Sequence, residues 1–181
     1  MTTGDKQFEA AAGQGRLERV DSGLSQKIIL RELVGQAQLF GELKPAEVNK
    51  IADFVQAYRA PQGYVLCREG ERGESLFVVI DGKIDLYKKA DQGAASGDHG
   101  VKIHTVRNGK SIGEMSWLDG LAYSATAVAA EVTTFLVVSH SKFEKLSQEH
   151  PDVALKLMTG VAKLISLRLR QTTGVLLDHL G

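Results

Sequence analysis

The segment that begins at Gly113 has the composition of a turn that leads into a short helix over residues 113–118. Glycine tolerates the tight backbone conformation that such an entry requires. The first amides of a helix have no partner inside the helix, and they lie at the positive end of its dipole. Such amides bind anions readily. The sequence therefore predicts a site for a negatively charged group at the start of this helix.

Side chains that commonly bind metals or attack substrates show no pattern that supports either activity. Cys67 is the single cysteine, which excludes a disulfide within the chain and a zinc site built on pairs of thiolates. We expect it to be a small buried apolar residue. No serine or cysteine pairs with a histidine in a recognisable nucleophile motif, and the histidines lack the i, i+4 spacing of helical metal ligands. We therefore predict no catalytic residue and no metal site. The five histidines are His99, His104, His140, His150 and His179.

The overall composition is that of a globular domain without a general attraction to polyanions. The chain has 181 residues, and its 22 basic residues are balanced by 22 acidic ones. This balance argues against non-specific binding to nucleic acid or anionic membranes. An apolar fraction of 43% is enough for a hydrophobic core. No segment reaches the roughly 18–20 apolar residues that cross a bilayer, and the N-terminus lacks the apolar run of a signal peptide, so we predict a cytoplasmic protein.

The middle of the chain has the pattern of short strands separated by turns. Some segments are rich in β-branched and aromatic residues, and others alternate between polar and apolar. The expected strands cover residues 64–66, 76–80, 83–88, 101–106, 126–128 and 133–138. Asp81-Gly82 is a strong hairpin signal between two of them. Many short strands favour an antiparallel β-roll or barrel over a fold with parallel strands.

Apolar residues at helical spacing flank the strands on both sides. We expect helices over residues 24–37, from Pro45 and over 139–146, and a long helix that begins at Pro151 and breaks near Gly174. The long helix has an apolar stripe that must be buried against the roll, a second subunit or both. The stripe comprises Val153, Leu157, Val161, Leu164 and Ile165. Residues 1–23 are rich in glycine and polar residues and are expected to form a flexible N-terminal tail.

The order of these elements, together with several local motifs, resembles the cyclic nucleotide-binding domain family. That family includes the sensor domains of catabolite-activator-type regulators, the regulatory subunits of protein kinase A and the gating domains of certain channels. The motifs, in order, are LFGEL at 39–43, EGERGESLFVVIDG at 69–82, GEMSWL at 113–118, SAT at 124–126 and HPD at 150–152. The resemblance implies one domain over residues 24–181. Its fold would be mainly β, a jelly-roll-like antiparallel roll (double-stranded β-helix) with N-terminal helices and a long C-terminal helix.

The resemblance also implies which residues bind a ligand. They are Gly113, Glu114, Met115, Ser116, Tyr123, Ser124, Ala125 and Arg168. In the family, the amides at the positions of Met115 and Ser116 face the cyclic phosphate. The carboxylate at the position of Glu114 accepts a hydrogen bond from the ribose 2′-hydroxyl. Arg168 on the long helix lies near the position from which family members contact the base.

Tyr123 departs from the family pattern at the position that matters most for binding. The family usually has Pro-Arg before the SAT motif, and the arginine binds the phosphate, whereas this chain has Ala122-Tyr123. Tyrosine can donate one neutral hydrogen bond but carries no positive charge. A charge-assisted bond contributes about 1.5–3 kcal/mol, so its loss would weaken binding roughly 10- to 150-fold. Either binding is weak, or Lys110 or Arg168 supplies the charge, or the ligand differs. Tyr123 itself would be a stacking surface, a plug or part of the core.

Two functions are open at this point. The first is a regulatory sensor domain that binds a small anionic nucleotide-like ligand, cAMP or cGMP by resemblance, and signals through its C-terminal helix to a partner protein. The second is a degenerate domain that binds no ligand and serves as a dimerisation or scaffold module. We predict the first, with no other cofactor, no enzymatic activity and a homodimer formed through the C-terminal helix. Because the chain ends soon after that helix, we expect no direct DNA binding, and we expect no membrane contact.

Overall fold

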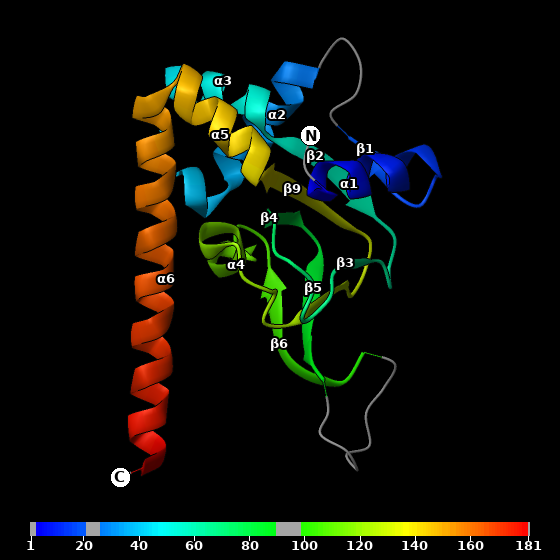
Figure 1. Ribbon diagram of the computed structural model, residues 1–181, viewed down its shortest axis with the longest axis vertical. Coiled ribbons are helices and arrows are strands. Elements are labelled where there is room, and N and C mark those ends of the chain that lie inside the picture. The colour runs from blue at the N-terminus through cyan, green and yellow to red at the C-terminus, as the bar shows by residue number, and fades with distance from the viewer. Residues whose placement is uncertain (1–2, 21–25, 90–98, 181) are drawn as a thin grey trace.

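The computed structural model describes residues 3–20, 26–89 and 99–180, which form a β-roll flanked by helices (Figure 1). The helices are α1 (Thr3–Gly13), α2 (Gln26–Gln36), α3 (Pro45–Ile51), α4 (Glu114–Asp119), α5 (His140–Glu149) and α6 (Pro151–Leu180), with 3-10 turns η1 (Gln38–Phe40) and η2 (Ala52–Phe54). The strands are β1 (Glu18–Arg19), β2 (Gln56–Ala60), β3 (Val65–Cys67), β4 (Ser75–Asp81), β5 (Lys83–Lys88), β6 (Val101–Arg107), β7 (Ser111–Ile112), β8 (Thr126–Ala129) and β9 (Thr133–Ser139). The predicted mainly β fold with a long C-terminal helix is therefore confirmed.

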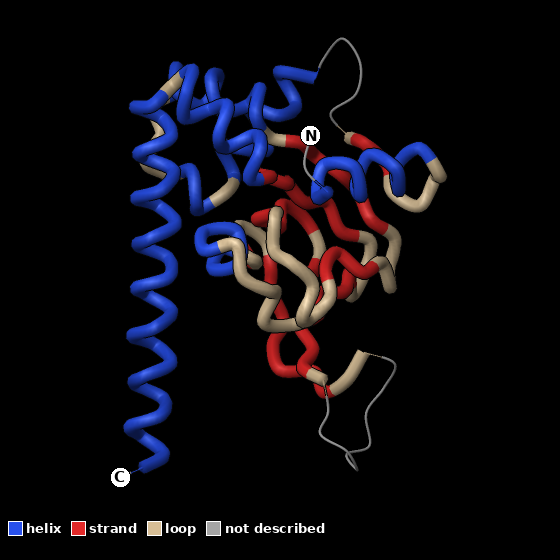
Figure 2. The backbone as a smooth tube through the Cα atoms, in the orientation of Figure 1, coloured by secondary structure: helices blue, strands red, loops and turns tan. Residues whose placement is uncertain are grey.

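Two antiparallel sheets form the roll. The five-stranded sheet has the order β1-β2-β9-β4-β7, and the four-stranded sheet has the order β3-β8-β5-β6. Figure 2 shows the strands at the centre of the molecule with the helices around them. The register pairs Phe77 with Val137 in the first sheet and Ile84 with Ala129 in the second.

The Asp81-Gly82 turn does not form the predicted hairpin. The strands on its two sides belong to different sheets, because β4 pairs with β9 and β7 whereas β5 pairs with β6 and β8. The turn therefore carries the chain from one sheet to the other. At this corner the Lys83 amide donates a hydrogen bond of 3.2 Å to the hydroxyl of Thr133. A local turn signal indicates a change of direction, and it does not identify the strand that becomes the neighbour.

The side chains of β4 divide the core into two parts. Leu76, Val78 and Ile80 pack in a cluster with buried residues from the helices. Phe77 and Val79 face the other way, into a cluster whose residues come from both sheets. Successive side chains of a strand point to opposite faces. Since both faces of β4 are buried, its sequence is a continuous apolar run.

Residues 3–20 differ from the predicted flexible tail. Helix α1 docks on the roll, and the side chains of Phe8 and Ala11 are each only 1% exposed. Strand β1 follows and pairs with β2. Composition misjudges this segment because one apolar face is enough to hold a helix when a tertiary partner covers it. The remaining residues of the predicted tail, 1–2 and 21–23, lie outside the described residues.

Helix α6 continues through Gly174 without the predicted break. Its first half packs on its own domain, because the predicted apolar stripe faces the helical part of the core. In that stripe Val153, Leu157 and Val161 are buried, and Leu164 and Ile165 are partly buried.

Ion pairs hold the first half of α6 to the N-terminal helices. The ammonium group of Lys156 donates to the two carboxylate oxygens of Glu47 at 2.6 and 2.8 Å. This bond, together with the Lys44 amide, lowers the pKa of Glu47. Lys163 pairs with Glu42 two turns further along α6. The start of α6 is thus fixed, and its second half extends past α4 and the roll (Figure 1).

Candidate ligand-binding site

All eight residues that the sequence assigns to ligand binding line one cavity of about 110 Å³. They are Gly113, Glu114, Met115, Ser116, Tyr123, Ser124, Ala125 and Arg168. The fold thereby brings Arg168 of α6 to the segment that contains α4, although Arg168 is more than 40 residues from that segment in sequence. Four further lining residues, which sequence reasoning missed, are Cys67, Leu86, Ile112 and Ala127. Burial raises the pKa of the Cys67 thiol to about 12, so it is a neutral apolar wall as predicted.

Gly113 positions the start of α4 next to strand β4. Its φ of 81° is left-handed, and a Cβ atom built on it would lie 2.8 Å from the carbonyl oxygen of Ser75. Only glycine fits both the conformation and the close approach. The first backbone bond of the helix runs from the Trp117 amide to the Gly113 carbonyl, at 2.9 Å. The amides of Glu114, Met115 and Ser116 come before Trp117 and therefore have no partner within the helix, as the predicted anion site requires.

Glu114 is a buried carboxylate with two partners. Its side chain is 4% exposed, and its Oε1 accepts a hydrogen bond of 2.5 Å from the Ser111 hydroxyl. The same oxygen lies 2.7 Å from the guanidinium group of Arg168. Arg168 also donates to the carbonyl oxygen of Ser111. A buried charge needs such partners, so Arg168 joins α6 to the base of α4.

Tyr123 is part of the core and forms one wall of the cavity. Its hydroxyl donates to the carbonyl oxygen of Ser75 at 2.9 Å and accepts from the Ser75 amide at 3.1 Å. Its ring lies 6.3 Å from the ring of Phe77. Burial raises the pKa of Tyr123, which keeps the phenol neutral. Of the three readings of this residue, the structure favours core packing.

A second, larger cavity of about 510 Å³ adjoins the first. The two share Leu86, Ile112 and Arg168, so Arg168 lies at their boundary. Lys110, the other cation considered from the sequence, lines the larger cavity and donates to the side-chain carbonyl of Gln38 at 2.9 Å. The lining is otherwise drawn from η1, β5, β6, the β6–β7 turn, β7 and α6, and it includes His104, Thr105, Val106, Arg107, Gly109, Ser111, Leu164, Leu167, Gln171 and Thr172.

The segment that contains most of these cavity residues matches a known protein family. Residues 58–150 match the model of the cyclic nucleotide-binding domain. The matched segment includes strands β3 to β9 and all of α4. The chain belongs to the cyclic nucleotide-binding domain family.

Relatives of this cyclic nucleotide-binding domain occur in regulators and channels. The chain is 32% identical over 133 residues to the cyclic AMP receptor protein of Thermus thermophilus, covering 74% of this chain and 57% of the relative. It is 30% identical over 123 residues to a cyclic nucleotide-gated potassium channel of Rhizobium etli, covering 68% and 32%. A cyclic nucleotide-binding domain from Methylobacillus flagellatus superposes with a TM-score of 0.74 at 27% identity, covering 91% of this chain and 90% of that one. The chain therefore spans only part of both curated relatives.

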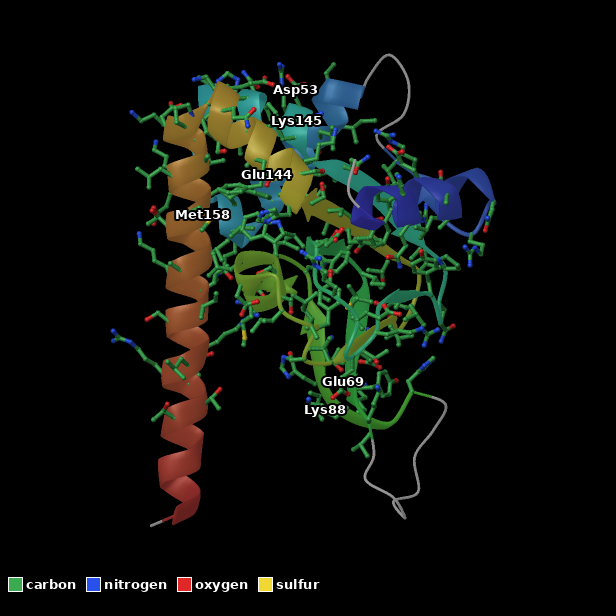
Figure 3. The ribbon with its side chains drawn as sticks, in the orientation of Figure 1. Asp53, Glu69, Lys88, Glu144, Lys145 and Met158 are labelled. Carbon is green, nitrogen blue, oxygen red and sulfur yellow. The ribbon has the colours of Figure 1, made fainter. Side chains whose placement is uncertain are left out.

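The family motif at residues 69–82 supports Tyr123 through backbone hydrogen bonds. The Gly70 amide donates to the Tyr123 carbonyl at 3.0 Å, and the Tyr123 amide donates to the Glu71 carbonyl at 2.8 Å. Figure 3 labels Glu69, the first residue of this motif, and Lys88 at the end of β5; their charged groups lie 2.9 Å apart. The Lys89 amide and Lys88 lower the pKa of Glu69. In this cyclic nucleotide-binding domain the motif therefore acts as a support for the wall of the cavity.

Two further findings concern the described part of the domain. Within it, no cluster of three or more His, Cys, Asp or Glu side chains is placed to hold a metal ion. None of the helices described is both long enough and apolar enough to span a bilayer.

Proposed function

We propose that this domain is a sensor that binds a cyclic nucleotide-like anion in the two joined cavities and signals through α6. The observation that carries the proposal is the convergence of all eight predicted residues on one cavity that opens toward a larger one. Ligand sites for molecules of this size occupy about 300–1,000 Å³. The cavity at α4 is smaller than that, so a nucleotide must extend into the larger cavity.

The positive charge that the family takes from its arginine would come from Arg168. In this proposal the α4 amides and Arg168 together face the cyclic phosphate, and Glu114 accepts from the ribose hydroxyl. The guanidinium group is already held by Glu114 and Ser111, and its five donors leave some for a ligand. A ligand that contacts Arg168 acts directly on α6, which supports this helix as the element that transmits binding to a partner protein.

Calorimetry on the full chain tests the proposal. We expect heat of binding with cAMP or cGMP, and we expect Glu114→Gln to weaken the affinity at least about 10-fold because it removes a charge-assisted hydrogen bond. Glu131→Gln is the matched control, since Glu131 pairs with Lys83 on the surface away from the cavities. An unchanged affinity in Glu114→Gln would show that this carboxylate does not face the ligand.

The alternative function is a degenerate domain that binds no ligand and serves as a scaffold. Two observations favour it: a neutral, hydrogen-bonded Tyr123 replaces the phosphate arginine, and Arg168 is paired with Glu114. Absence of heat with both cyclic nucleotides at millimolar concentration would support this alternative against the sensor. Neither function requires catalysis, and we propose that the domain is not an enzyme.

The exposed face of α6 supports a homodimer. Side chains there follow the 4, 3, 4, 3 spacing of a coiled-coil seam, with two exposed leucines at its ends. The seam comprises Leu155, Thr159, Ala162, Ser166 and Leu169, of which Leu155 is 69% and Leu169 66% exposed. In this proposal a second copy of α6 covers it.

We therefore expect a dimer by size-exclusion chromatography with light scattering. Leu169→Glu should raise its dissociation constant at least about 10-fold, because burying one leucine contributes about 1.5–3 kcal/mol. Ile28→Glu on α2 places the same charge at an equally exposed apolar position outside the seam. A monomeric wild-type chain, or equal effects of the two variants, would contradict this seam.

A further inference from the structure

The larger cavity has an unbalanced charge. Four basic side chains line it, namely His104, Arg107, Lys110 and Arg168, and no Asp or Glu is among the described residues of its lining. Arg168 is paired with Glu114 at the boundary with the smaller cavity. Within the described chain, Arg107 and Lys110 have no carboxylate partner, and Lys110 contacts only the neutral amide of Gln38. Two cations therefore face this cavity without a counter-charge.

Arg107 and Lys110 are held in place by a braced turn. The Lys110 amide donates to the Arg107 carbonyl at 3.2 Å, which closes the turn between β6 and β7. Two backbone hydrogen bonds join the turn to β4. The Gly109 amide donates to the Val79 carbonyl at 2.7 Å, and the Val79 amide donates to the Lys110 carbonyl at 2.9 Å. The Gln38 amide donates to the Gly109 carbonyl at 3.3 Å, so η1 supports the same turn. The two cations thus project from a fixed backbone.

Two exposed cations on a braced turn, with no carboxylate partner in the described chain, suit a different ligand from one that ends in a neutral base. A purine base presents ring nitrogens, exocyclic groups and a flat face, none of which neutralises two full charges. A phosphate neutralises both, and charge-assisted bonds to phosphate are about twice as strong as neutral ones. The wall at Tyr123 has no cation where the family pattern has one, while the larger cavity carries two cations besides Arg168. The charge distribution therefore favours a second anion in the larger cavity, in addition to the one at α4.

We infer that the ligand is a nucleotide with two separated phosphate groups, of the cyclic dinucleotide class. One phosphate lies at the α4 amides and Arg168, and the second lies between Arg107 and Lys110. This inference rests on the proposed sensor function and specifies its ligand. The cavity of about 510 Å³ has the size of a site for a whole ligand of this kind.

Titration calorimetry of the full chain with cyclic di-GMP, cyclic di-AMP, cAMP and cGMP tests the inference. We expect at least one dinucleotide to bind about 10-fold or more tightly than both mononucleotides. The double variant Arg107→Gln, Lys110→Gln should remove that advantage, because it should weaken dinucleotide binding at least about 10-fold more than mononucleotide binding. The control variant Arg31→Gln, Lys145→Gln removes the same charge from α2 and α5, distant from β6 (Figure 3 labels Lys145), and should change neither.

The outcomes separate this inference from the proposed function. If cAMP or cGMP binds as tightly as both dinucleotides, the sensor function stands and the two-phosphate ligand is wrong. The same conclusion follows if the Arg107, Lys110 double variant weakens all ligands equally, because the cations would then act on a feature that mononucleotides share. If none of the four nucleotides binds, both proposals fail.

Discussion

Phe8→Ala should lower the free energy of unfolding by about 3–5 kcal/mol, the range for removing a buried aromatic side chain. The residue lies in a segment whose composition predicts a flexible tail, yet it is 1% exposed. Its ring is 5.7 Å from Tyr58, 5.5 Å from Phe77 and 6.2 Å from Phe135, at tilted or edge-on angles that favour aromatic pairs. Truncation to alanine removes these contacts and leaves a cavity under α1. Urea unfolding of the full chain measures the effect.

Ile28→Ala is the control for this measurement. Ile28 is also a large apolar residue on an N-terminal helix, but it is 66% exposed. We expect its truncation to change the unfolding free energy by no more than about 0.5 kcal/mol, as at other exposed positions. A loss below about 1 kcal/mol for Phe8→Ala would mean that α1 does not dock on the roll in solution.

The contrast between Phe8 and the strands shows what the sequence can and cannot predict about this fold. Strands such as β5 and β9 are encoded locally, through alternation and β-branched residues, and they are where the sequence places them. The docking of α1 depends on an aromatic surface that Tyr58, Phe77 and Phe135 form only after the sheets assemble. The hairpin predicted at Asp81-Gly82 is wrong for the same reason, because strand partners are set by the whole sheet and not by the turn.

In the candidate site too, the residues close together in sequence are predictable and the contacts between distant elements are not. Seven of the eight site residues lie in one short segment, from Gly113 to Ala125, so local motifs are enough to predict that they lie together. The place of Arg168 beside this segment follows from its position along α6, because a straight helix advances a fixed distance per residue. The larger cavity could not be assembled in this way. Its wall combines Gln38, Arg107 and Gln171 from three distant elements, and no motif links them.

The hydroxyl of Tyr123 has a structural role that a sequence comparison with the family does not suggest. It satisfies both backbone groups of Ser75 within a buried part of the roll. Unpaired buried groups cost about 1–3 kcal/mol each. The substitution that removes the phosphate arginine therefore also adds a brace between the cavity wall and β4. Binding strength and domain stability are linked at this one position.

Tyr123→Arg should increase the affinity for cAMP roughly 10- to 150-fold, because it adds one charge-assisted bond of about 1.5–3 kcal/mol at the position where the family binds the phosphate. The same change should lower the melting temperature, since Ser75 loses both of its bonds to the phenol and Phe77 loses a ring neighbour. Calorimetry with cAMP and thermal unfolding of the same protein give the two readouts.

Tyr123→Phe separates the two effects. It keeps the ring against Phe77 and removes only the hydroxyl, so it should destabilise the domain by at least about 1–3 kcal/mol, the cost of one unpaired Ser75 group, with no gain in affinity. A rise in affinity in both variants would mean that loosening the wall, and not the new charge, admits the ligand. An unchanged affinity in a folded Tyr123→Arg protein would mean that the phosphate of cAMP does not lie against this wall. The α4 amides would then bind their anion without help from the position that the rest of the family uses.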